Sequence, residues 1–394
     1  MSRPAIPAEL IEVVLENLWD ERSALLSCSL VNGNFYLAAQ RHIFRSMWLK
    51  RRKDKPDLSS AVAKEACKST LLPIASISTM AEIMAVSPHL GRHIRELTFD
   101  LPVREDEDGE LTRILGTVSG VKRVAIAGVS LDWDSMSMYQ ESAILKLITA
   151  SPSLDRLHFL GIVQLPRAVL AAAMRFARVL SFSGSLQDRD GDDDEPDVEP
   201  RLQTLILQDC SLEILQALPK AAALKKLACL PYSPTRTSHN PSAFLPYVPS
   251  TVTTLDIIIG STQASPCLSN LPSLRSVTLR YDRGTRRYLP MRFAETLAQL
   301  PAVSLTVIFF TPISTPIDIW HDAAPLPVRG LDACLVEDIH FRLHAQVSPK
   351  LLKSGNKLTR LRESFRAALE AALPKFRLQF SFVMGDWSYA AELP

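Results

Sequence analysis

The stretch Leu202–Leu212, with the sequence LQTLILQDCSL, decides the fold of this chain. Leucines at 202, 205 and 207 form its apolar triplet, and the last two are two positions apart, the spacing of side chains on one face of a strand. The same spacing, apolar-x-x-apolar-x-apolar, recurs along the chain, with a weaker copy around 180. The middle positions of these triplets are residues 97, 124, 157, 180, 205, 227, 255 and 277. The repetition predicts a series of short strands of similar build.

A proline stands shortly before several of these triplets. Helix-like stretches, such as 78–86 and 141–149, precede several of these prolines. Since proline disfavours helix at the preceding residue, each X-Pro pair is expected to end a helix and turn the chain toward a strand. The pairs are Ser87-Pro88, Ser151-Pro152, Leu218-Pro219, Val248-Pro249 and Leu271-Pro272. Repeated helix, proline and strand predict an α/β solenoid in which each unit packs on its neighbours.

The repeating region resembles an irregular leucine-rich repeat. Leu202, Leu205, Leu207, Cys210 and Leu212 fit the whole repeat motif, and the other copies keep its first three positions. An ordinary α/β domain with several short parallel strands is the alternative. Further strands are expected around 305–309 and 336–341, followed by a helix over 357–373 and a strand over 376–382. This last helix and strand would cap the open end of the solenoid.

The first fifty residues have a different character. They predict three short helices, over 10–18, 20–31 and 34–44. The first carries two adjoining apolar stripes, whereas one stripe is enough for a surface helix of a small domain. About forty residues are too few to bury a complete core alone. We therefore interpret this end as a docking module, with a helical cap of the following domain as the alternative.

The segment IPAELIEVVLENLWDERSALLSCSLVNGNFYLAAQRHIFRSMWL, residues 6–49, resembles an F-box. It departs from the usual pattern at Asn32–Phe35, where a basic pair and a tryptophan are more common. The resemblance implies that the module binds a Skp-type adaptor and, through it, a cullin scaffold. The adaptor-binding residues that it implies are Ile6, Pro7, Leu10, Val14, Leu18, Leu25, Leu26, Val31 and Phe35.

Together the two resemblances imply a substrate-receptor subunit of an SCF-type E3 ubiquitin ligase. The repeats would bind a target protein through strand residues that point away from the apolar core, and the chain itself would not be an enzyme. A non-ligase interaction scaffold with an F-box-like cap is the alternative function, and an enzyme hidden in the solenoid is a third. The candidate target-binding residues are Arg123, Arg156, His158, Lys226, Asp256 and Arg280.

Composition narrows the function classes. The 394 residues carry a net charge of +2, so no global signal for nucleic-acid binding exists. Six scattered cysteines form no Cys-x-x-Cys pair, and the eight histidines show no metal-ligand spacing. We find no phosphate-binding glycine loop, no nucleophile elbow, no secretion signal and no apolar run long enough to span a membrane. We expect an intracellular protein, cytoplasmic, nuclear or both, without cofactor or metal.

Charged segments mark the expected boundaries. The basic run 50–55 is interpreted as a solvated linker, with a nuclear-localisation patch as the alternative. The acidic segment 188–199 lacks the glycine position of a calcium-binding loop and predicts a disordered insertion, as does 104–110. The expected organisation is a docking module over 1–50, a linker over 51–75 and a solenoid over 76–394, with an acidic insertion at about 187–200.

Overall fold

The computed structural model divides into two compact units, residues 1–202 (unit 1) and 203–394 (unit 2). The part of the chain that it describes comprises 6–18, 21–50, 74–101, 105–187, 200–208, 224–230, 245–259, 271–281, 303–313, 338–347 and 376–384, with a few positions between these ranges. The acidic segment 188–199, the basic run 51–55 and the motif positions Cys210 and Leu212 lie outside the described residues.

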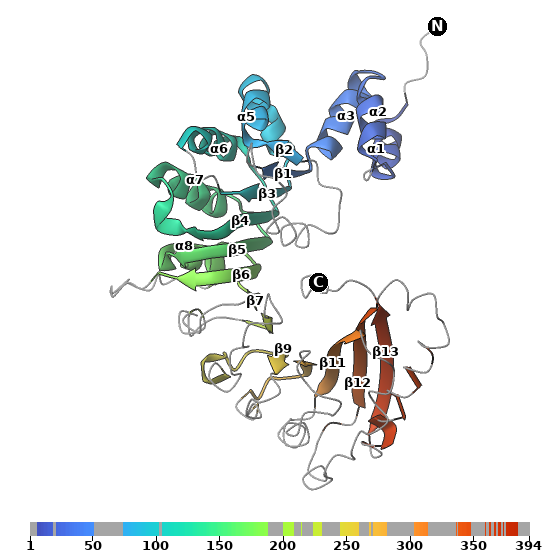
Figure 1. Ribbon diagram of the computed structural model, residues 1–394. Helices are drawn as coiled ribbons and strands as arrows, with labels where there is room; N and C mark the ends of the chain where they lie inside the picture. The colour runs from blue at the N-terminus through green and yellow to red at the C-terminus, as the bar shows by residue number, and fades with distance from the viewer. Residues whose placement is uncertain are drawn as a thin grey trace. The chain divides into compact units, whose positions relative to one another are not determined.

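Unit 1 begins with a three-helix module. Its helices are α1 (Ala8–Glu16), α2 (Arg22–Ser29) and α3 (Gly33–Ile43), which confirms the three expected helices. Figure 1 shows them packed together near the N-terminus. The chain then enters β1 (Ser46–Lys50) directly, within the last residues of the expected module over 1–50.

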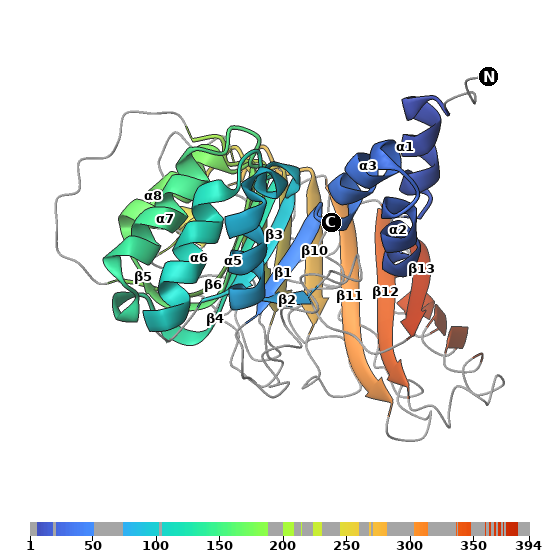
Figure 2. The ribbon, with the colours of Figure 1, turned by 90° about the horizontal axis from the view of Figure 1, so that it is seen from above.

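The rest of unit 1 is an open parallel sheet covered by helices. Its strand order is β2 (Ile74–Ser76), β1, β3 (Glu96–Asp100), β4 (Arg123–Asp132), β5 (Arg156–Leu165) and β6 (Val179–Leu186). All of these pairs are parallel. Four helices, shown in Figure 2, lie side by side along one face. They are α5 (Ile77–Val86), α6 (Glu105–Thr117), α7 (Met138–Thr149) and α8 (Arg167–Phe176).

The expected triplets form the core of this sheet. Parallel register aligns Leu97, Val124, Leu157 and Leu180 in one row, and Phe99, Ile126, Phe159 and Phe182 in the next. All eight side chains are fully buried. Phe159 meets Phe182 edge to face, with ring centroids 6.3 Å apart. Because the triplet recurs at equivalent positions of successive strands, similar apolar residues align in rows across the sheet.

Three elements of unit 1 differ from the expectation. Helix α6 covers most of the segment 104–110, which was wrongly taken for a disordered insertion. Strands β1 and β2 were also missed, and β2 lies at the sheet edge beside β1. Figure 1 shows both in this part of the sheet, where β1 lies between β2 and β3.

Unit 2 continues with parallel strands in sequence order. They are β7 (Thr204–Gln208), β8 (Lys226–Leu230), β9 (Thr254–Ile259), β10 (Ser276–Tyr281), β11 (Ser304–Ile313), β12 (Asp338–Val347) and β13 (Arg377–Met384). Each of these strands is parallel to the next one in the sequence, from β7 to β13. The triplet leucines Leu205, Leu227 and Leu255 are again aligned and fully buried. A short 3-10 helix lies at Leu245–Tyr247.

The expected elements near the C-terminus are also present. Strands β11, β12 and β13 confirm the three expected strands, and each is longer than its apolar pattern indicated. The described positions between 359 and 371 are helical, with an Arg366–Glu370 ion pair one turn apart. The chain is thus an α/β protein with thirteen strands in the described residues, all parallel within each unit.

Candidate functional site

The three-helix module has a small core of its own. In α1, Ile11 and Leu15 are one turn apart and point inward, where they join Leu25, Ala39 and Ile43. Leu18, Cys28, Phe35, Ala38 and Phe44 pack around this centre. The inward stripe thus uses only one side of α1.

A second set of apolar side chains on the same helices points outward. It begins with Ile6, just before α1, and includes Leu10, Val13 and Val14 of α1, which are spaced as one helical face. Leu30 at the end of α2 is 86% exposed. We call the whole set the apolar docking surface. It consists of Ile6, Leu10, Val13, Val14, Leu26, Leu30, Val31, Tyr36 and Leu37, each at least 47% exposed.

This exposure is unusual for so short a segment. Single apolar residues on a surface are normal, but nine on three small helices point to an interaction site. Covering each half-exposed side chain would contribute roughly 1 kcal/mol, before the cost of association. A partner that covers most of the surface would therefore gain enough for specific binding.

Polar contacts fix the module's shape. Glu12 of α1 accepts from Arg41 of α3 at 3.3 Å and lies 3.1 Å from the Nε2 atom of His42. Asn32 caps α3, because its Oδ1 atom accepts from the backbone N–H groups of Asn34 and Phe35. The segment Asn32–Phe35, which departs from the usual F-box pattern, therefore has a structural role in starting α3.

The residues implied for adaptor binding divide into two groups. Ile6, Pro7, Leu10, Val14, Leu26 and Val31 are exposed. Leu18 and Phe35 are partly buried against the module core, and Leu25 is only 2% exposed. Leu25 is therefore a core residue and not a free contact, which corrects its assignment. The prediction also omitted Val13, Leu30, Tyr36 and Leu37, although Val13 lies one turn from Leu10.

The candidate target-binding residues of unit 1 lie together. Register places Glu96, Arg123 and Arg156 side by side on β3, β4 and β5. Arg123 forms an ion pair with Glu96 at 3.3 Å, so part of its charge is already neutralised. His158 lies two residues further along β5, where burial and then the charges of Arg156 and Arg123 lower its pKa to about 4. It is a neutral imidazole at physiological pH.

The candidate residues of unit 2 lie differently. Asp256 and Arg280 were expected on an exposed face, but both are buried. The Nε and Nη2 atoms of Arg280 donate to the two carboxylate oxygens of Asp256, each at 2.7 Å. This two-point pairing satisfies both charges inside the protein, so the expected role in target binding was wrong for this pair. Lys226 begins β8 and is partly buried.

Neither a candidate metal cluster nor a candidate membrane-spanning helix occurs among the described residues. Among them, no group of three or more histidine, cysteine or acidic side chains could hold a metal ion. Nor is any helix in that part of the chain both long and apolar enough to cross a membrane. His340 on β12 lies 2.9 Å from the hydroxyl of Ser381 on β13. Burial and the nearby Arg342 lower the pKa of this histidine.

The apolar docking surface is thus the most distinctive feature of the described residues. Its helices are held by their own core, and its outward side chains come from all three of them. Compared with known proteins, the chain matches no protein-family model and no curated protein.

Proposed function

We propose that this chain is a substrate-receptor subunit of an SCF-type ubiquitin ligase. In this role the three-helix module binds a Skp-type adaptor, and the strand-and-helix repeats hold a target protein. The observation that carries the proposal is the apolar docking surface, since nine outward apolar side chains on a module with its own core need a partner.

The F-box resemblance and the exposure of the residues agree in several places. Leu10, Val14, Leu26 and Val31 are positions that the resemblance assigns to adaptor contacts, and each is about half exposed or more. Catalysis would then be positional. The chain brings a lysine of the target near a ubiquitin-charged enzyme and supplies no reacting group, so its contribution is proximity.

Co-purification of the full chain with a co-expressed Skp-type adaptor tests the proposal. We expect Val31→Asp and Leu10→Asp to abolish co-purification, because each places a charge in an apolar contact. Val86→Asp is the matched control, since Val86 is 85% exposed on α5, outside the module. It should leave adaptor binding unchanged. Absence of wild-type binding, or equal loss in the control, contradicts the proposal.

The same preparation separates the ligase from a non-ligase scaffold. A cullin that co-purifies with the adaptor and the chain supports the ligase. An adaptor that binds without recruiting any cullin supports the scaffold. Leu25→Asp is unsuitable as a binding variant, because a charge at this buried position would unfold the module.

A further inference from the structure

A row of charged residues stands at the edge of unit 1 where its strands begin. The residues directly before β1, β3, β4, β5 and β6 are Arg45, Arg95, Lys122, Asp155 and Arg178. Their backbones form a continuous ladder. Arg95 N–H donates to Arg45 O at 2.8 Å and Lys122 N–H to Arg95 O at 2.7 Å, and the ladder continues to Asp155 and Arg178. Successive side chains therefore start about 4.8 Å apart.

The first three members of the row carry positive charge that nearby acids leave unneutralised. Arg45 and Lys122 are exposed, and neither has an ion-pair partner among the residues described. The Nη1 atom of Arg95 donates to Gly120 O at 2.7 Å, which orients the guanidinium and leaves its other N–H groups available. At the far end, Asp155 accepts from Arg178 at 2.7 Å, so this pair adds no net charge.

Further cations lie beside the start of the row. Arg92 and His93 end the 3-10 helix that leads into β3, so they lie close to Arg95 in the chain. Burial and then the charges of Arg92, Arg41, His89 and Arg95 lower the pKa of His93. Nearby acids already have partners. Glu12 contacts Arg41 and His42, and Glu96 contacts Arg123 and Ser46.

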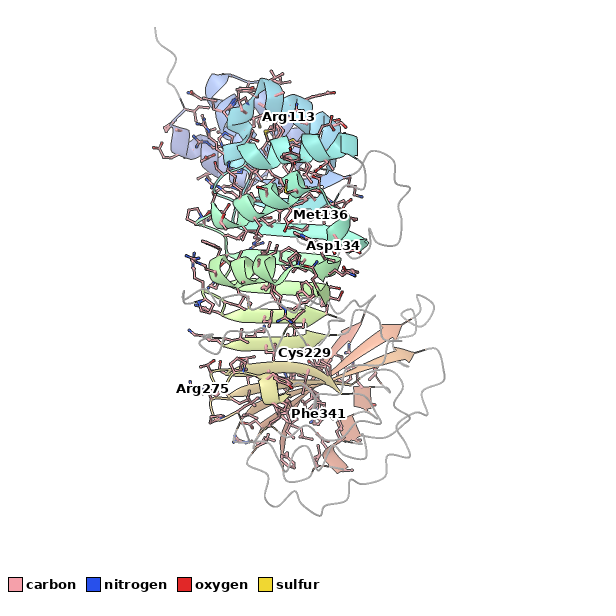
Figure 3. The ribbon with its side chains drawn as sticks, turned by 90° about the vertical axis from the view of Figure 1, so that its left-hand side faces the viewer. Arg113, Asp134, Met136, Cys229, Arg275 and Phe341 are labelled. Atoms are coloured by element: carbon pink, nitrogen blue, oxygen red, sulfur yellow. The ribbon has the colours of Figure 1, made fainter. Side chains whose placement is uncertain are left out.

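The two edges of the sheet differ in charge. At the opposite edge, where β4 ends, Asp132 and Asp134 are present and Asp134 accepts from the side chain of Gln187. Figure 3 labels Asp134 and Met136 at this edge. Cations are present there as well, at Lys50 and Arg167, but four of the five residues that directly precede β1, β3, β4, β5 and β6 are cationic.

We propose that Arg45, Arg92, Arg95 and Lys122 form a basic edge surface that binds an acidic, extended segment of a partner protein. In an extended peptide, the side chains of alternate residues are about 6.8 Å apart. The Arg and Lys side chains of the row start about 4.8 Å apart, and they are long enough to reach carboxylates at the wider spacing. Asp155 interrupts the row, which disfavours a continuous polyanion such as nucleic acid. A short peptide can place its carboxylates beside the cations that come before Asp155 in the row.

This inference names a class of target for the proposed ligase subunit, but it does not depend on adaptor binding. The probe is a short fluorescein-labelled peptide of alternating Glu and Ser, compared with the same peptide carrying Gln in place of Glu. Binding to the full chain is measured by fluorescence anisotropy at low and at physiological salt. We expect the Glu peptide to bind, with affinity falling as salt rises, and the Gln peptide not to bind.

Charge reversal locates the contact. Arg45→Glu combined with Lys122→Glu should weaken Glu-peptide binding roughly tenfold or more, because attraction becomes repulsion at two positions. Arg167→Glu is the control, since Arg167 is exposed at the start of α8. It should change affinity less than twofold. Thermal melting of each variant verifies that it is folded.

Three results would overturn the inference. They are equal affinity for the Glu and Gln peptides, equal weakening by the Arg167 control, and a single-stranded oligonucleotide that binds the surface more tightly than the Glu peptide. Val31→Asp keeps this test separate from the proposed function. It should abolish adaptor co-purification and leave peptide affinity unchanged, so either proposal can fail alone.

Discussion

The three-helix module and the sheet of unit 1 use apolar residues in opposite ways. In the sheet, the triplet residues form rows with both neighbours in place, and side chains such as Phe159 and Leu157 are fully buried. In the module, α1 buries Ile11 and Leu15 but exposes Leu10, Val13 and Val14. The sheet buries its apolar side chains within the chain, whereas the module leaves the nine side chains of the apolar docking surface exposed.

The largest expected effect concerns the sheet. Phe159→Ala removes a fully buried ring that meets both Phe182 and Trp133. It should lower the free energy of unfolding by about 3–5 kcal/mol, from lost burial and the cavity left behind. Chemical denaturation measures the change. Tyr139→Ala, at a side chain 74% exposed, should alter it by less than about 0.5 kcal/mol, and equal effects would contradict the described core.

A matched pair of neighbours tests the module. Leu25→Ala should destabilise the three helices by about 2–4 kcal/mol, because Leu25 is at their centre. Leu26→Ala should cost less than about 0.5 kcal/mol, since this side chain is half exposed. Hydrogen exchange of amides in α1–α3 reports both. If Leu26→Ala proved more destabilising than Leu25→Ala, the assignment of Leu25 to the inward face and Leu26 to the outward face of α2 would be contradicted.

Acid should affect the sheet through His158. Its pKa is lowered to about 4 in the folded chain, against about 6.5 when unfolded, so the unfolded state binds more protons between these values. Stability is therefore unaffected above pH 6.5 and falls as pH decreases toward 4, by about 1–2 kcal/mol at pH 5. His158→Gln should reduce this loss, as measured by denaturation at pH 7 and pH 5. An identical loss in the variant would mean that other groups cause it.

The smallest expected effect concerns the start of α3. Asn32→Ala removes the cap of two backbone N–H groups and should destabilise the module by about 1 kcal/mol. Asn34→Ala leaves the cap in place and should have little effect. Thermal melting followed by helical circular dichroism compares the two. Equal losses would show that the Asn32 side chain contributes nothing special to α3.

Much of the sheet could be predicted because its signal repeats. The triplet marks β3–β10, since its last two apolar residues are two positions apart in every copy and side chains two apart in a strand share a face. Strand β1 lacks a preceding proline and follows α3 directly, so Ser46–Lys50 resembled the end of a helix. Helix α6 was missed because its first turn is acidic, a feature common to helix starts and disordered segments.

The candidate site was less predictable than the fold. The pair Leu25-Leu26 is apolar at both positions, and periodicity alone does not show which side chain faces the core. Asp256 and Arg280 lie on adjacent strands, but their sequence separation gives no sign of a buried pair. The basic edge surface was also missed, because its members come from separate repeats and become neighbours only through strand pairing.

The order of the strands has a consequence for how the chain folds during synthesis. From β4 onward in unit 1, each strand pairs with the strand that precedes it in the sequence. Each new helix and strand can therefore add to the growing sheet as it leaves the ribosome, without waiting for a distant segment. Strand β1 is the exception, because its partners β2 and β3 are made after it. Until then Met47–Leu49 has no strand to pair with, so this short apolar segment stays unpaired for longer than the strands that follow it.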